Sequence, residues 1–206
     1  MKEQIYTIDI NDAFDAGGCP ICTLAVRFEQ GLYEFILGPA MMEPDFRIQT
    51  NQKGFCNRHL QGLFSRPNKL GLGLVMESLL KEINQKPERE LPKHHDTCYF
   101  CDRKNKYMAS LADAVVYMWK NDRDFAMKWT KIEGVCLPHA NYLANATKNK
   151  DIIKAVYAAA ARRSAALQDS VTAFCQSFDY RNAGVDIGED KYAVEQVCKW
   201  LGGTHG

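Results

Sequence analysis

Apolar residues recur along most of the chain at steps of three and four positions, the spacing that places them on one face of an α-helix. After Cys22 this pattern runs through Leu24, Phe28 and Leu32 and predicts a helix that ends at Gly38-Pro39. No stretch shows the alternation of apolar and polar residues that is typical of a half-buried strand. The predicted fold class is therefore all-α.

Three further segments predict helices in the middle and at the end of the chain. Residues 69–84 should turn inward the side chains of Val75, Met76, Leu79, Leu80 and Ile83. Residues 150–178 predict a long alanine-rich helix with a buried side made of Val156, Ala160, Leu167, Val171, Phe174 and Phe178. A last helix, from about 189 to 201, should stop at Gly202-Gly203. Residues 85–97, QKPERELPKHHDT, are polar and contain two prolines, so we expect a linker there.

Six of the eight cysteines belong to a pattern that occurs twice. A C-x2-C pair is followed, after 33 residues in the first copy and 34 in the second, by a C-x2-H pair. The copies are offset by 79 residues at the first pair and by 80 at the second. Ligand types, order and spacing all match, which indicates an internal repeat of about 80 residues.

The repeated residues are those that bind zinc. A structural zinc site takes four tetrahedral thiolate and imidazole ligands, commonly as two closely spaced pairs. Residues i and i+3 at a helix start lie on the same side, and the positive end of the helix dipole favours thiolates. We expect two zinc ions per chain, each bound within one repeat, because the duplicated order of the motifs argues for four ligands in each copy. A crossed arrangement, such as Cys19 and Cys22 with Cys136 and His139, stays open, because loop-closure entropy favours the shorter loops by less than about 1 kcal/mol. The first set is Cys19, Cys22, Cys56 and His59, and the second is Cys98, Cys101, Cys136 and His139.

Other uses of these cysteines stay open. Iron–sulfur clusters also take thiolate ligands and an occasional histidine, and are the main alternative to zinc. A thioredoxin-like redox pair would need a βαβ setting, which the pattern does not predict. Cys175 and Cys198 fall outside the repeat and are interpreted as small buried apolar residues on helix faces. His94 and His95 are interpreted as solvated linker residues, with a ligand role as the alternative.

The sequence contains no motif of an open catalytic site. It has no HExxH, no glycine-rich phosphate loop and no GxSxG. In the stretch FDYRN, Asp179, Tyr180 and Arg181 follow a helix, which is typical of a hydrogen-bonded structural turn. A polar ligand pocket at these three residues is the alternative. Arg162 and Arg163 are interpreted as part of a solvated helix face.

Composition narrows the setting in which these sites would work. The chain has 206 residues, of which 46% are hydrophobic and 25% charged, and its net charge is +1. That balance argues against nucleic acid as a partner. The N-terminus has acidic residues where a signal peptide needs an apolar centre, and no apolar run approaches the roughly 20 residues that span a bilayer. We therefore expect the cytoplasm, where thiols stay reduced.

The motifs CPIC, MMEPDFRIQTNQKGFCNRHL, CYFCD, GVCLPH and FDYRN together resemble an uncharacterised bacterial family. Its members are grouped as a conserved domain of unknown function, and some carry the label of ABC-transporter substrate-binding proteins. The resemblance covers nearly the whole chain and implies a helical, cysteine-rich protein, without an established activity, substrate or partner. A substrate-binding protein would be exported, which the N-terminus of this chain does not predict.

We therefore expect one compact all-α protein with a first Cys3His unit at 1–84, a linker at 85–97, a second unit at 98–148 and C-terminal helices at 149–206. The expected role is that of a non-enzymatic, zinc-stabilised scaffold that presents a helical surface to another protein. One alternative is a thiolate-based sensor of redox state or metal. Another is an enzyme or electron-transfer protein that carries iron–sulfur clusters.

Overall fold

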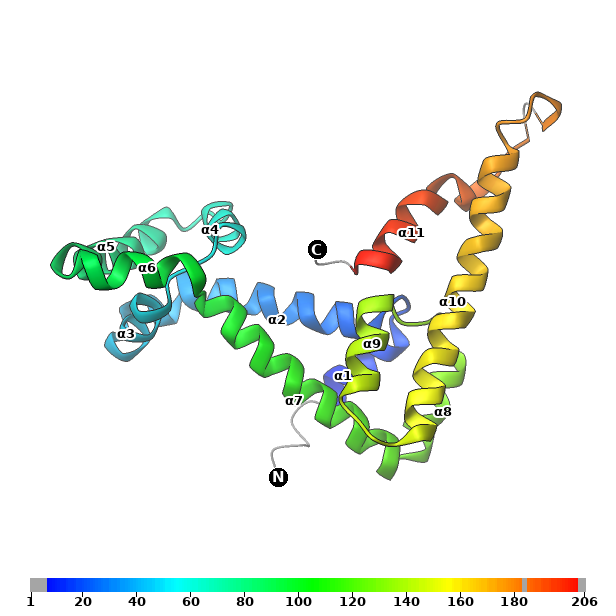
Figure 1. The fold of residues 1–206 in the computed structure, drawn as a ribbon, viewed down its shortest axis with the longest axis horizontal. Coiled ribbons are helices and arrows are strands. Elements are labelled where there is room, and N and C mark those ends of the chain that lie inside the picture. Colours follow the sequence, from blue (N-terminus) through cyan, green and yellow to red (C-terminus); the bar gives the residue numbers. More distant parts are fainter. Residues whose placement is uncertain (1–6, 183–184, 204–206) are drawn as a thin grey trace. The chain divides into compact units, whose positions relative to one another are not determined.

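The computed structural model describes residues 7–182 and 185–203, with the side chains of residues 92–96 excepted. This part of the chain consists of eleven α-helices and three short 3-10 helices, without a strand (Figure 1). The predicted all-α fold class is therefore confirmed. None of the helices found in these residues has the length and apolar character that a bilayer crossing requires.

The chain forms two compact units whose bounds differ from those of the repeats. Unit 2 is residues 27–108, and unit 1 combines residues 1–26 with residues 109–206. Two helices belong to both: α2 (Pro20–Leu37) begins in unit 1 and ends in unit 2, while α7 (Tyr99–Asn121) begins in unit 2 and ends in unit 1. The expected helix from Cys22 to Gly38 is thus confirmed as α2.

Unit 2 is built around the second half of α2 and the start of α7. Between them lie η1 (Pro39–Met42), α3 (Pro44–Lys53), α4 (Asn57–Phe64), α5 (Lys69–Gln85) and α6 (Pro87–Asp96). Helix α3 packs against α5, and the Arg47 side chain joins them by donating to the carbonyl oxygens of Met41 and Leu74, at 2.7 Å each. The hydrophobic core of this unit includes Leu32, Tyr33, Ile36, Phe46, Phe55, Leu63, Val75 and Phe100.

Two details of unit 2 differ from the sequence predictions. Helix α5 buries Val75 and Leu79 as expected, but Leu80 is 56% exposed. The segment expected as a linker is largely the helix α6. Pro87 stands at the first position of this helix, where its missing N–H costs nothing, and Glu88 lies in the first turn, where the helix dipole favours an acid. Proline here starts a helix instead of preventing one.

Unit 1 contains α1 (Thr7–Asp15), the start of α2, the end of α7, α8 (Arg123–Lys131), α9 (Leu137–Asn145), α10 (Lys150–Gln176), η2 (Tyr180–Asn182), η3 (Gly188–Tyr192) and α11 (Ala193–Gly202). Helices α9 and α11 pack along α10 (Figure 1). The rings of Phe14, Phe125 and Trp129 join α1 to α8, with Phe14 about equally close to both partners, at 4.8 and 5.1 Å between ring centroids.

Helix α10 confirms the long C-terminal helix and corrects part of its predicted buried side. Val156, Ala160 and Leu167 are buried, but Phe178 is 76% exposed. The helix ends at Gln176, so Phe178 lies beyond it and the helical periodicity does not determine where the Phe178 side chain points. Cys175 and Cys198 are exposed, so their interpretation as buried apolar residues was wrong. Cys175 follows the half-buried Phe174, and one residue turns the side chain by about 100° around the helix.

Candidate metal sites

The eight repeated residues meet in two clusters, each drawn from both repeats. Site 1 consists of Cys19, Cys22, Cys136 and His139, and site 2 of Cys56, His59, Cys98 and Cys101. In each site the four ligand atoms lie within 4.8 Å of one another, and the cluster could hold a metal ion. The predicted pairing within each repeat was wrong. The C-x2-C pair of one repeat meets the C-x2-H pair of the other.

The length of α2 and α7 explains the exchange. An α-helix rises about 1.5 Å per residue, so the 18 residues of α2 extend about 27 Å and the 23 residues of α7 about 35 Å. Each helix carries the chain away from the cysteine pair at its start before α3 or α8 begins. The expectation of closure within a repeat rested on the duplicated order of the motifs, which takes no account of the rigid helix that follows each C-x2-C pair.

Each ligand pair stands at the start of a helix in the same local geometry. The first cysteine of every pair directly precedes its helix, and its carbonyl oxygen accepts the first helical hydrogen bond, at 2.9–3.2 Å, from the residue four positions later. This places the first ligand at the N-cap and the second at the third helical position, where side chains converge as they do in a capping box. Each site therefore joins two helix N-termini, whose dipoles favour thiolates.

A glycine two residues before each C-x2-H pair shapes the entry to its helix. Gly54 has φ of 60° and Gly134 has φ of 144°, a region that side-chain-bearing residues rarely adopt. A Cβ atom on Gly134 would lie 2.6 Å from the Cβ of Arg163 and 2.8 Å from the carbonyl oxygen of Ala159. Gly54 accepts a hydrogen bond at 3.0 Å from the backbone N–H of Tyr99, which brings the start of α7 to that of α4.

The distances between ligand atoms are alike in the two sites. In site 1 the Nδ1 atom of His139 lies 3.1–3.6 Å from the three sulfurs, and two sulfur–sulfur distances are 3.6 and 3.7 Å. In site 2 the Nδ1 atom of His59 lies 3.1–3.6 Å from its three sulfurs, and Cys56 lies 4.0 Å from Cys101. All six cysteines are free thiols.

The electrostatics of both clusters favour a cation at their centre. In site 1, hydrogen bonding of the protonated Cys136 thiol to the Cys19 and Cys22 sulfurs raises its pKa, and burial adds to this. In site 2, burial and the charge of Cys98 raise the pKa of the Cys101 thiol to about 12. Burial lowers the pKa of His139, but the adjacent Cys19 and Cys22 sulfurs raise it overall to about 9. Three thiolates so close together repel one another, and a divalent cation would remove that repulsion.

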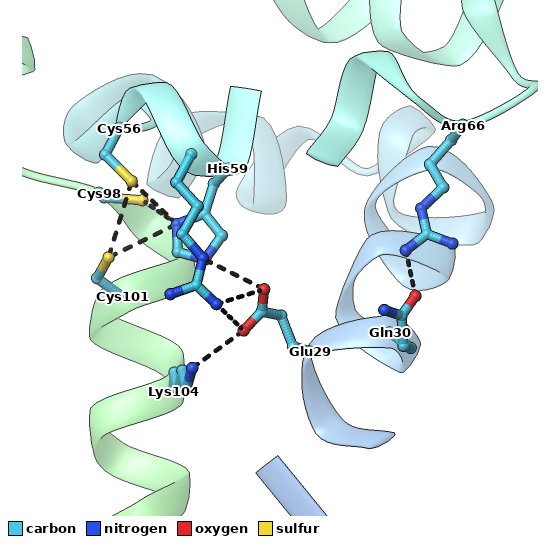
Figure 2. A network of polar contacts seen from close by, with 9 residues as sticks. Glu29, Gln30, Cys56, His59, Arg66, Cys98, Cys101 and Lys104 are labelled. Carbon is cyan, nitrogen blue, oxygen red and sulfur yellow. Dashed lines mark hydrogen bonds and ion pairs between the residues drawn. The ribbon is translucent and has the colours of Figure 1, made fainter. Parts of the chain in front are cut away.

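Site 2 has a second layer of charged groups around its histidine. On the side of the His59 ring away from the sulfurs, Oε1 of Glu29 lies 3.7 Å from Nε2 (Figure 2). Glu29 in turn accepts hydrogen bonds from Arg58, at 3.3 Å, and from Lys104, at 3.1 Å. The His59 ring stacks on Phe100 at 4.7 Å between centroids. At 3.7 Å the carboxylate is too far for a hydrogen bond to Nε2, but its negative charge beside the ring makes the histidine a better ligand for a cation.

This network keeps each group in the protonation state that a metal site requires. Burial acts to raise the pKa of Glu29, but the hydrogen bond and charge of Lys104, with the charge of Arg58, hold that pKa below its ordinary value. Burial lowers the pKa of His59, in spite of the opposing charge of Glu29. The carboxylate is therefore ionised and the imidazole neutral, which is the form that binds metal.

The remaining candidate residues lie apart from the two clusters. Asp179 and Arg181 form an ion pair at 2.5 Å across an exposed turn, and Tyr180 between them is 87% exposed. The hydrogen bonds from Arg181 lower the pKa of the Asp179 carboxyl. This is the geometry of the structural turn. The side chains of His94 and His95 lie outside the described residues. Arg163 is half-buried beside site 1 instead of lying on a solvated face.

The sequence interpretation missed Glu29, Arg58 and Lys104. A signal for Lys104 exists in the helical period, because it lies three residues after Cys101 of the same site on α7. Glu29 lies seven residues, or two turns, after Cys22 on α2, but Cys22 belongs to site 1, so the period gives no signal that Glu29 lies at site 2.

Comparison with known proteins identifies the family. A model described as a family of unknown function, DUF6062, matches residues 1–96 and again residues 85–206. The chain belongs to this family. The two matches are consistent with the internal repeat read from the cysteine and histidine motifs. No curated protein and no solved structure matches the chain.

Proposed function

We propose that this DUF6062 protein binds two zinc ions, one at each Cys3His cluster, and acts as a metal-stabilised helical scaffold for another protein. The observation that carries the metal assignment is the spacing of the ligand atoms. With Zn–S bonds of about 2.3 Å and Zn–N bonds of about 2.0–2.1 Å, tetrahedral geometry puts sulfurs about 3.8 Å apart and nitrogen about 3.5 Å from sulfur. In the two clusters, the sulfur–sulfur distances given above are 3.6–4.0 Å and the nitrogen–sulfur distances are 3.1–3.6 Å.

The same spacing supports a single ion over an iron–sulfur cluster. A cluster inserts several iron and sulfide atoms between its protein ligands, so the ligand atoms stand farther apart than around one ion. All four positions of each tetrad are filled by protein, which is typical of structural rather than catalytic zinc. The metal would hold the start of α2 to the start of α9 in unit 1, and that of α7 to that of α4 in unit 2.

The partner and the compartment are inferred from the surface and from the thiol chemistry. Phe178, Tyr180 and Val185 are large apolar or aromatic residues, 63–87% exposed, in and around the turn after α10. Neighbouring exposed apolar residues of this kind are typical of protein-interaction surfaces. Six reduced thiols suit the cytoplasm, where disulfides are rare.

Elemental analysis of anaerobically purified protein tests the metal assignment. We expect two zinc ions per chain and a colourless protein. Replacement by Co²⁺ should give the strong visible bands of tetrahedral thiolate coordination at both sites. A brown protein that contains iron and sulfide would refute the proposal and favour the electron-transfer or enzyme alternative. Protein that is folded without any metal would refute it as well.

A further inference from the structure

Site 1 borders a cavity that reaches its sulfur atoms. The cavity has a volume of about 340 Å³ and is open to solvent. The three cysteines of site 1 line one side, and Arg163, Lys199 and Trp200 line the other. This volume accommodates several water molecules or a small solute. Solutes can therefore reach the sulfurs of site 1 from a preformed space.

The far side of the cavity is made by α11, a helix that lies beyond the two repeats. The indole N–H of Trp200 donates to the carbonyl oxygen of Val135 at 3.0 Å, next to Cys136. Arg163 of α10 donates to Oε1 of Gln196 at 3.0 Å. These two hydrogen bonds hold α11 over site 1 and leave the cavity between the helix and the sulfurs.

The surroundings of the two histidines also differ. His59 of site 2 has Glu29 at its Nε2 atom, and the cysteines of site 2 belong to or pack against the hydrophobic core of unit 2. For His139, no carboxylate partner is recorded among the residues that the structure describes. Loss of such a partner typically weakens metal binding by about 10- to 100-fold. The metal at site 1 should therefore be held less tightly.

We propose that site 1 is a site of oxidation by small peroxides, with Cys19 as the sulfur that is attacked first. This inference rests on the proposed metal binding and assigns different roles to the two sites. Cys19 is half-buried, whereas Cys22 and Cys136 are 4% and 3% exposed. Cys136 is the second sulfur, because it lies 3.7 Å from Cys19. Site 2 stays a structural site.

The chemistry uses hydrogen peroxide as the oxidant. The Cys19 thiolate attacks one peroxide oxygen, an S–O bond forms, the O–O bond breaks and hydroxide leaves. The Cys136 thiolate then attacks the sulfenic sulfur, an S–S bond forms, the S–O bond breaks and a second hydroxide leaves. The two thiolates lose two electrons, peroxide gains them, and two protons from solvent convert the hydroxides to water. The metal keeps only Cys22 and His139 and dissociates.

Peroxide-driven zinc release from the full chain tests this inference. Zinc content is measured first, then release is followed with a colorimetric chelator, and disulfides are mapped by mass spectrometry. Starting from two zinc ions per chain, we expect one to leave at least about 10-fold faster than the other, together with a Cys19–Cys136 disulfide. Trp200→Ala, which enlarges the cavity, should speed the fast phase only. Tyr117→Ala, an aromatic truncation on the exposed side of α7, should change neither phase.

The outcomes separate this inference from the metal assignment. A zinc content of two, followed by release of both ions at one rate, would overturn the inference and leave the metal assignment intact. Faster release from site 2, or a disulfide that excludes Cys19, would do the same. Protein without metal before oxidation would overturn the proposed function and this inference with it.

Discussion

The clearest difference between the two sites is Glu29, which lies beside the histidine of site 2. It lies on α2 with 8% of its surface exposed, and it contacts His59, Arg58 and Lys104. The corresponding position of the second repeat, 79 residues later, is Met108. Among the residues that the structure describes, a carboxylate thus lies beside the histidine of site 2 and not beside that of site 1, and it should make site 2 the tighter of the two.

Replacing this carboxylate should weaken one site selectively. For Glu29→Gln we expect metal affinity at site 2 to fall by about 10- to 100-fold, because the substitution removes the negative charge that lies 3.7 Å from the imidazole Nε2. Affinity at site 1 should not change. Glu34→Gln, on the exposed side of the same helix, is the matched control. Chelator competition measures both sites, and an equal loss at the two sites would contradict the role given to Glu29.

The sequence reveals the metal ligands far better than it reveals the residues around them. All eight residues of the two clusters could be predicted as candidate ligands because each stands in a short motif with fixed spacing, so that local helix geometry alone brings the members of a pair together. Glu29 and Arg58 come together only in the folded unit, from different helices. Their proximity depends on tertiary packing, which no local spacing encodes.

Among the secondary-structure elements, the four helix starts that carry ligands share one construction. Each has a cysteine before its first residue and a second ligand at its third. The helices themselves were predictable from apolar periodicity, and α2, α5 and α10 are where the pattern places them. Helix α6 was not predictable in this way, because a proline such as Pro87 is typical both of a linker and of a first helical position.

Gly134 offers a test of how the entry to α9 is built. Gly134→Ala should lower the free energy of unfolding by about 2 kcal/mol, because the new methyl group meets Arg163 and the Ala159 carbonyl. In contrast, Gly73→Ala in α5 meets nothing within 4 Å and should raise that free energy by about 0.5–1 kcal/mol. Urea unfolding of the metal-loaded protein measures both. Equal effects of the two substitutions would contradict this explanation.

For the molecule as a whole, the exchange of ligand pairs between repeats is the central feature. In the structure each tetrad takes one pair of residues from each repeat, so each compact unit depends on residues from both repeats. The repeat was visible in the sequence, but the pairing was not. Loop-closure entropy differs by less than about 1 kcal/mol between the two pairings. The rigidity of α2 and α7 decides between them, and this follows from helix length and packing rather than from ligand spacing.

Two double variants, each with two cysteines replaced by serine, test this exchange most directly through their metal content. Cys19→Ser with Cys136→Ser removes two ligands of site 1 only, so the protein should keep one zinc ion. Cys19→Ser with Cys56→Ser removes one ligand from each site, so the protein should keep none. Closure within each repeat would reverse these results: the first variant would lose both ions and the second would keep one. That reversal would contradict the crossed arrangement.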